Sequence, residues 1–220
     1  YDRNASRYGY VSQPALNAAA ALTVALRRRG IKVDGNARVG RVPAHSTQLA
    51  LTRSVPLARF LMQTNAPSDN FYAETLIKQL GYELGRGGTT SAGAAVVRRQ
   101  AAKFDLFPQV YDGSGLSRAD RSSPSQVVSL LKRMLDHRVL YRSLALTGRS
   151  GTVADRMRHT VAQGRCHTKT GTLHDASNLA GYCEATNGHT LAFAILMNYV
   201  YPYAAHALQD RMVVSLVRGR

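Results

Sequence analysis

The sequence predicts an α+β fold in which an antiparallel sheet is flanked by helices. The first observation is that helical patterns come first, with capping residues, apolar residues at helical spacing and glycine stops. The second is that the last third changes to three strand-like segments with short turns, followed by a terminal helix. Helices, then a meander of strands, then a closing helix are typical of an α+β domain.

The expected elements follow one another along the chain. Ser12 can cap a first helix that Gly30 ends, and a strand-like stretch at 49–52 leads to a helix that begins near Pro56. Ser123 can cap a later helix that has Pro124 in its first turn. The remaining helices are expected at residues 68–85, 91–105, 124–137 and 202–217, and the strands at 164–172, 178–186 and 190–198.

Composition limits the classes of function. With 220 residues, 45% of them hydrophobic, the chain is long enough to bury a core. The 29 Lys and Arg against 13 Asp and Glu give a formal charge of +16, spread along the chain, which indicates a solvated basic surface and would also suit an anionic cell wall or membrane surface. The interleaved aromatic and arginine motifs of RNA-binding domains are missing, so no nucleic-acid partner is expected. No apolar run approaches the ~18 residues of a membrane span, so no transmembrane segment is expected.

Three clusters of polar and glycine residues carry the candidate chemistry. Ser68-Asp69-Asn70 begins a predicted helix, DGSGLSR at residues 112–118 forms a loop, and HTKTGT at residues 167–172 lies on the first predicted strand. Taken separately, the first is an ordinary helix cap and the third an ordinary strand end. Together, in this order and on these elements, they match the S-x-N and K-T-G elements of penicillin-recognising enzymes.

The residue types suit a serine acyl-transfer site. Such a site needs a proton carrier for the leaving amine, a cation near the substrate carboxylate and donors aimed at the developing oxyanion. The Ser68 hydroxyl can relay a proton, and the Asn70 amide can both donate and accept hydrogen bonds. Lys169 supplies a compact positive charge that favours a carboxylate ligand.

The strand residues after Lys169 are the candidate substrate-binding wall. Thr170 and Thr172 can hydrogen-bond a carboxylate, and Gly171 allows ligand and backbone to approach closely. The two cysteines, Cys166 and Cys183, lack metal-ligand spacing, so no metal site is expected. No cofactor is expected either.

Almost the whole chain resembles the peptidase S13 family, the dacB-like penicillin-binding D-alanyl-D-alanine carboxypeptidases. Besides the two motifs, DGSGLSRADRSSP and LAGYCEATNGHTLAFAILMN carry the resemblance. It implies a β-lactamase- or transpeptidase-like fold, here incomplete, with the Thr172 backbone N–H in the oxyanion hole. It also implies that residues 1–40 are the tail of an inserted accessory domain and that residues 41–220 are the returning part of the catalytic domain.

The resemblance also implies a function. The family members are extracytoplasmic serine-type carboxypeptidases or endopeptidases that act on peptidoglycan peptides through an acyl-enzyme and are acylated by penicillins and other β-lactams. A non-catalytic peptidoglycan-binding relative is the alternative, and a basic nucleic-acid-binding domain is a more remote one.

The nucleophile of this family is the one element that the sequence lacks. An S-x-x-K motif should precede S-x-N, and none occurs before Ser68. The formal match Ser129-Leu130-Leu131-Lys132 lies inside a predicted amphipathic helix whose leucines are expected in the core. The nucleophile is therefore expected in a missing N-terminal segment, which would be a partner of this chain.

Four further expectations concern residues around the motifs. A simple hairpin places Cys166 opposite Cys183, within reach of a disulfide that would form in an oxidising compartment. The segment 190–198 should present an apolar edge on the side where the absent strand would pair. His167 is expected at the rim of the cleft. Three tyrosines are expected to pack at the corner before the last helix: Tyr199, Tyr201 and Tyr203.

Overall fold

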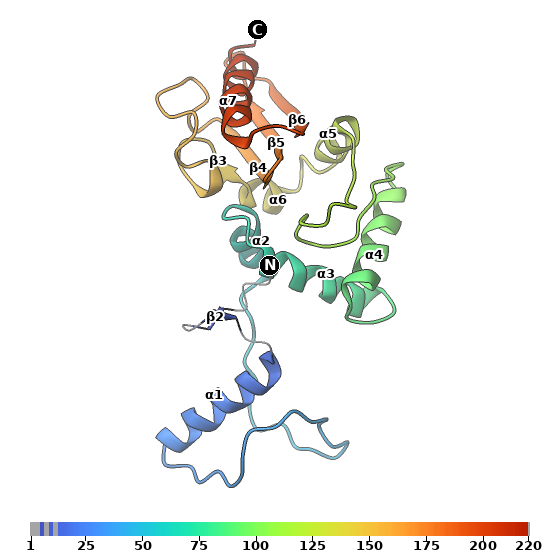
Figure 1. Ribbon diagram of the computed structural model, residues 1–220, viewed down its shortest axis with the longest axis vertical. Coiled ribbons are helices and arrows are strands. Elements are labelled where there is room, and N and C mark those ends of the chain that lie inside the picture. The colour runs from blue at the N-terminus through green and yellow to red at the C-terminus, as the bar shows by residue number, and fades with distance from the viewer. Residues whose placement is uncertain (1–4, 7–8, 11–12, 220) are drawn as a thin grey trace. The chain divides into compact units, whose positions relative to one another are not determined.

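The computed structural model describes residues 5–6, 9–10 and 13–219, with side chains from residue 13 onward (Figure 1). The chain divides into two compact units, Asp2–Ser54 and Val55–Arg220. The candidate motifs all lie in the second unit.

The first unit holds one long helix. Two short strands, β1 (Ala5–Ser6) and β2 (Gly9–Tyr10), pair antiparallel, and α1 (Pro14–Arg28) follows them. The guanidinium of Arg27 donates hydrogen bonds to backbone carbonyl oxygens at 33 and 35, which ties the following chain to the end of the helix. The expected cap Ser12 lies outside the described residues.

The strand expected at 49–52 does not form. Among the described residues, no strand pairs with this stretch, and a strand without a neighbour has no partner for its backbone groups.

The second unit is built on a four-stranded antiparallel sheet in the order β3-β4-β5-β6. The three expected strands are confirmed, and a short first strand is added to them. The bounds are β3 (Ala145–Leu146), β4 (Cys166–Leu173), β5 (Ala176–Glu184) and β6 (Thr190–Asn198).

Helices flank this sheet, as the α+β prediction requires: α5 and α7 pack against it, whereas α3 and α4 pack on each other. Those that precede it are α2 (Leu57–Asn65), α3 (Asn70–Leu84), α4 (Thr90–Ala102), α5 (Pro124–Arg133) and α6 (Arg138–Ser143). The short 3-10 helix η1 (Gly151–Val153) lies between β3 and β4, and α7 (Pro202–Arg218) closes the unit. None of the helices in the described part of the chain has the length and apolar character of a membrane span.

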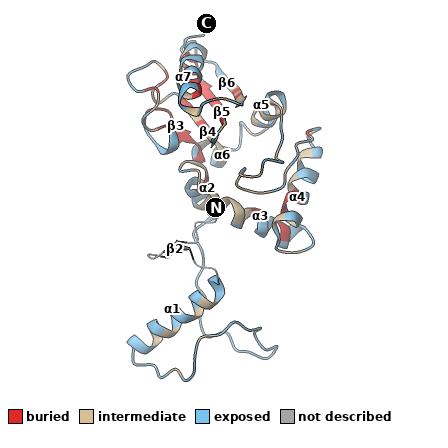
Figure 2. Cartoon of the chain, in the orientation of Figure 1, coloured by how far each residue is buried: buried red, intermediate tan, exposed pale blue. Residues whose placement is uncertain are grey.

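The sheet buries both faces because successive side chains of a strand alternate between them. One face packs on α7, where Val213 and Val217 join Leu179 and Ile195 in the hydrophobic core. On the other face, the Tyr182 hydroxyl donates a hydrogen bond of 2.7 Å to the carbonyl oxygen of Leu131 in α5. Figure 2 shows most of the buried residues in the sheet and in α7, with a smaller group where α3 and α4 meet.

A disulfide between Cys166 and Cys183 joins β4 to β5 in this core. The two cysteines are paired directly across the hairpin, with their Cα atoms 4.1 Å apart. The pairing expected from the symmetric spacing about the turn is therefore confirmed.

The helix α5 follows its expected cap but not its expected burial. The Ser123 hydroxyl accepts a hydrogen bond from the Gln126 N–H, with Pro124 at the first position. Leu130 and Leu135, expected in the core, are instead 41% and 39% exposed. The spacing of apolar residues correctly predicted an amphipathic helix, but the rest of the protein covers its apolar face only in part.

Candidate functional site

Ser68 lies in a tight junction between α2 and α3. Its backbone φ of 59° is in the left-handed region, which costs a residue other than glycine on the order of 1 kcal/mol. The N–H groups of Ser68 and Asp69 donate to the carbonyl oxygens of Asn65 and Thr64, which holds the junction in this conformation. Asp69, rather than Ser68, caps α3 by accepting the N–H of Tyr72. Because the cap is made by its neighbour, the Ser68 side chain is free to serve the site.

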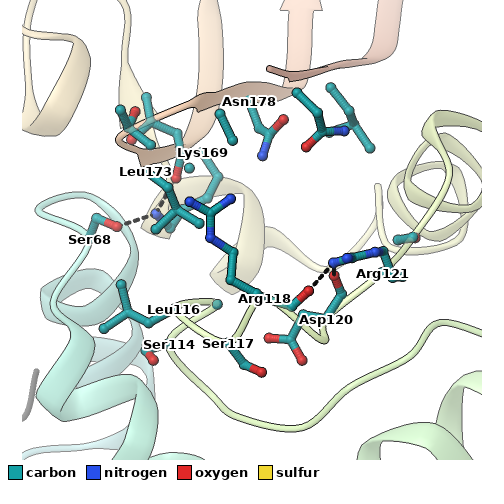
Figure 3. Close-up of a pocket in the computed structure, with 18 of the residues that line it drawn as sticks. Ser68, Ser114, Leu116, Ser117, Arg118, Asp120, Arg121, Lys169, Leu173 and Asn178 are labelled. Atoms are coloured by element: carbon teal, nitrogen blue, oxygen red, sulfur yellow. Dashed lines mark hydrogen bonds between the residues drawn. The ribbon is translucent and has the colours of Figure 1, made fainter. Parts of the chain in front are cut away.

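Lys169 of β4 meets this serine across a large separation in sequence. Its Nζ donates a hydrogen bond of 2.5 Å to the Ser68 hydroxyl oxygen and another of 2.8 Å to the carbonyl oxygen of Thr170 (Figure 3). Burial lowers the pKa of Lys169 to about 8. A lysine with this pKa can give and regain a proton near neutral pH, and the serine is within direct hydrogen-bonding distance of it.

All six residues predicted for the site line one pocket of about 1070 Å³. The pocket lies between the start of α3, the loop after α4 and the strands β4 and β5. Asn70 is the first residue of α3, and its amide makes no hydrogen bond with any described residue, so it is available to a ligand. Ser129, the formal alternative nucleophile, is not among the lining residues.

The strand wall of the pocket is formed by residues 170–172. The Thr170 hydroxyl donates a hydrogen bond of 2.7 Å to the Thr152 hydroxyl in η1. Gly171 and Thr172 are exposed to the pocket. A Cβ atom on Gly171 would come no closer than 3.6 Å to another atom of the chain, at Asn178, which is an ordinary contact. The fold itself therefore leaves room for a side chain at 171.

The loop opposite the strand is held by carboxylates. Asp112 accepts the N–H groups of Gly115 and Ser117, and Asp120 accepts that of Tyr111. Burial, with a further contribution from the neighbouring Asp112 carboxyl, raises the pKa of Asp120 to about 6.

Glu74 is a residue of this site that sequence reasoning missed. Its Oε1 accepts the N–H groups of Gly113 and Ser114, and its Oε2 accepts the Thr90 hydroxyl. It thereby fixes the loop to α3. The only signal was its position four residues after Asn70, which places both on one face of the helix.

Arg118 links the loop to the turn between β4 and β5. Its Nη2 lies 2.6 Å from Oδ1 of Asp175 and 2.8 Å from Nδ1 of His174. The hydrogen bond and charge of Arg118 lower the pKa of Asp175. Figure 3 shows the Arg118 side chain projecting between the loop and β4. The ion pair bounds one end of the pocket.

His167 is not at the rim of this pocket, contrary to expectation. Its ring packs against Tyr141 with ring centroids 4.2 Å apart, and burial lowers the pKa of His167. It lies on the same face of β4 as Lys169, because the two residues are two positions apart, but the residues of this strand that line the pocket begin only at Lys169. No group of three His, Cys, Asp or Glu among the described residues is arranged to hold a metal ion.

Comparison with known proteins identifies relatives that match most of the chain. The family model described as D-Ala-D-Ala carboxypeptidase 3 (S13) matches residues 4–218. A D-alanyl-D-alanine carboxypeptidase of Actinomadura sp. (strain R39) is 34% identical, over 94% of this chain and 41% of its own length. The chain spans less than half the length of the first curated relatives that it matches.

Solved structures show the same fold. Penicillin-binding protein 4 (dacB) of Haemophilus influenzae superposes with a TM-score of 0.83 at 24% identity, over 95% of this chain and 50% of that one. A β-lactamase of Chitinophaga pinensis superposes with a TM-score of 0.59 at 17% identity, over 75% of this chain and 65% of that one. The β-lactamase-like fold predicted from the sequence is confirmed.

Proposed function

Because the chain belongs to the D-Ala-D-Ala carboxypeptidase 3 (S13) family, we propose that it forms part of a serine-type D-Ala-D-Ala carboxypeptidase or endopeptidase. Its substrates would be peptidoglycan peptides, and β-lactams would acylate the whole protein. The observation that carries the proposal is the contact between Ser68 and Lys169 beside residues 170–172 in a single pocket. An extracytoplasmic location is part of the proposal, and the disulfide supports it because such bonds persist in oxidising compartments.

In the proposed reaction a serine hydroxyl gives its proton to its lysine base and attacks the carbonyl carbon of the penultimate D-alanine, and the C–N bond to the last D-alanine breaks. The leaving nitrogen needs a proton. The Ser68 hydroxyl can donate its own proton and recover one from Lys169, because its oxygen already accepts a hydrogen bond from the lysine. Water then attacks the acyl-enzyme and releases the shortened peptide.

Other lining residues would bind the peptide. The unpaired amide of Asn70 would hold the substrate's peptide group, while Thr170 and Thr172 would hydrogen-bond the terminal carboxylate near the charge of Lys169. The backbone N–H of Thr172 would donate to the oxyanion. Gly171 would let the substrate lie close to the strand, since the pocket side of this residue is open.

The nucleophile and its lysine base would come from residues outside these 220. This part of the proposal rests on the absence of S-x-x-K before Ser68 and on the partial coverage of the relatives. Residues 41–220 would then be the returning part of the catalytic domain, and residues 1–40 the tail of an inserted domain.

Labelling with a fluorescent penicillin tests the proposal. The full-length protein should form a covalent adduct and release D-alanine from a D-Ala-D-Ala peptide, whereas the 220-residue chain should do neither. A full-length protein that binds the peptide without labelling or release would favour the non-catalytic peptidoglycan-binding alternative. Binding to nucleic acid that falls steeply with salt would favour the remaining alternative.

A further inference from the structure

Arg156 is a nearly buried cation that the proposed chemistry does not use. It lies three residues after η1, its side chain is 13% exposed, and it borders the pocket. Its Nε and Nη2 donate to Oδ1 of Asp210 at 2.9 and 2.6 Å. Nη2 also donates to Oε1 of Gln209 at 3.1 Å and to the carbonyl oxygen of His206 at 3.4 Å. One guanidinium is thus held by three residues of α7.

Gln209 carries this contact on to the sheet. It is fully buried, and its Nε2 donates to both the carbonyl oxygen and the hydroxyl oxygen of Ser177, at 3.0 and 3.1 Å. A buried amide is stable only when its donors and acceptor are satisfied. Arg156 and Ser177 together satisfy Gln209, so its side chain has one defined orientation.

The contacts that run from Arg156 through Gln209 to Ser177 reach residues 170–172 of β4 from both sides. Ser177 is paired directly with Thr172. On the other flank, Thr170 donates to Thr152 of η1, and the Arg156 N–H bonds to the carbonyl oxygen of Val153 in the same turn. The contacts therefore enclose residues 170–172 between η1 and β5, with α7 joining the two flanks.

We propose that Arg156 and Gln209 are positioning residues that fix residues 170–172 in place for the ligand. The inference rests on the proposed function, in which this segment binds the substrate carboxylate and the oxyanion. Neither side chain needs to contact substrate for this role. A displacement of ~1 Å at such a segment can cost on the order of a hundredfold in rate, so a remote pair that limits its movement affects catalysis.

The test uses the full-length protein with Arg156→Met or Gln209→Met. Arg158→Met is the matched control, because Arg158 lies two residues away and forms an exposed ion pair with Asp155. For each variant, kcat and KM with a D-Ala-D-Ala peptide and the rate of acylation by penicillin are measured well below the melting temperature. Hydrogen exchange of a peptic fragment that covers β4 and the start of β5 is measured in parallel.

We expect both positioning variants to reduce kcat/KM by about ten- to a hundredfold, with faster exchange across 170–177, and the control to change neither. Lower melting temperatures with unchanged kcat/KM would overturn the inference and leave a structural network only. A loss in Arg156→Met that Gln209→Met does not share would also overturn it, because Arg156 would then contact substrate itself. If the wild-type protein shows no turnover and no acylation, the proposed function fails. Hydrogen exchange still tests the positioning role in that case, because an unchanged exchange rate across 170–177 in both variants would refute it.

Discussion

The Nζ of Lys169 lies 2.5 Å from the Ser68 hydroxyl oxygen, although 101 residues separate them in sequence. Burial holds the pKa of this lysine at about 8, below the 10.5 that it has when exposed. Below pH 8 the folded protein therefore carries the full cost of a buried ammonium group. That cost is relieved as the pH rises from about 8 to 10.5, because the unfolded state then binds more protons than the folded state.

We therefore expect the stability of Lys169→Met, relative to that of the wild type, to be higher at pH 7 than at pH 10. The free energy of unfolding of the variant relative to the wild type should fall by about 2 kcal/mol over this range. Urea unfolding at the two pH values measures it, and the exposed Lys132→Met is the charge-matched control. A difference that does not change with pH would mean that Lys169 is not desolvated.

Replacement by alanine should lower the stability of the protein at one glycine of the site and leave it nearly unchanged at another. A Cβ atom on Gly113 would lie 2.5 Å from the carbonyl oxygen of Ala73 in α3, so Gly113→Ala must displace the loop from the helix. A Cβ atom on Gly171 meets nothing closer than 3.6 Å. We expect Gly113→Ala to destabilise by about 1–3 kcal/mol through overpacking, and Gly171→Ala to change stability by less than about 1 kcal/mol.

The effect of Gly171→Ala should appear in the acylation reaction instead of in the stability. Penicillin acylation of the full-length protein should slow in Gly171→Ala despite its normal melting temperature, because the added methyl group occupies the face that the ligand would use. Full acylation by Gly171→Ala would show that the ligand does not approach this strand closely.

The disulfide should stabilise the folded protein because it reduces the conformational entropy of the unfolded chain. Cys166 and Cys183 are 17 residues apart, and closing a loop of this length is worth about 3 kcal/mol in the chain-entropy model. Both cysteines are fully buried, so the double change to alanine removes the crosslink without exposing a polar group. We expect a loss of about 2–4 kcal/mol in urea unfolding. Equal stability of the variant and the oxidised wild type would contradict this.

Local pattern was enough to predict most of the fold. The alternation and turns of β4, β5 and β6 gave their bounds to within about two residues, the usual limit for element ends. β3 and α6 were missed because they have two and six residues, too few to show a period.

The site was predictable only where a motif marks it. Ser68 and Lys169 lie in short motifs, but Glu74, Arg156 and Gln209 act through contacts between distant segments, which no local pattern encodes. Burial was the least predictable property. Three tyrosines that were expected to pack at a corner are instead exposed by 94%, 75% and 79%: Tyr199, Tyr201 and Tyr203. An aromatic ring shows that a residue can be buried, but the sequence does not show which faces are covered.

The strand β6 is the edge of the described sheet. It pairs with β5 along its whole length, and its other side pairs with no described strand. Four apolar residues alternate along it, Leu191, Phe193, Ile195 and Met197, and the last three lie in or against the hydrophobic core. An apolar edge strand with free backbone groups pairs readily with another chain unless something covers it.

We therefore expect the purified 220-residue chain to self-associate through this edge. A charge placed on the strand should weaken the association, so Thr190→Lys should shift the sedimentation coefficient toward that of the monomer. Thr186→Lys adds the same charge at an exposed position outside β6 and should not. Sedimentation velocity over a range of concentrations makes the comparison. A wild-type chain that stays monomeric at all concentrations and unfolds cooperatively would contradict the prediction, since its edge would then be protected by the fold itself.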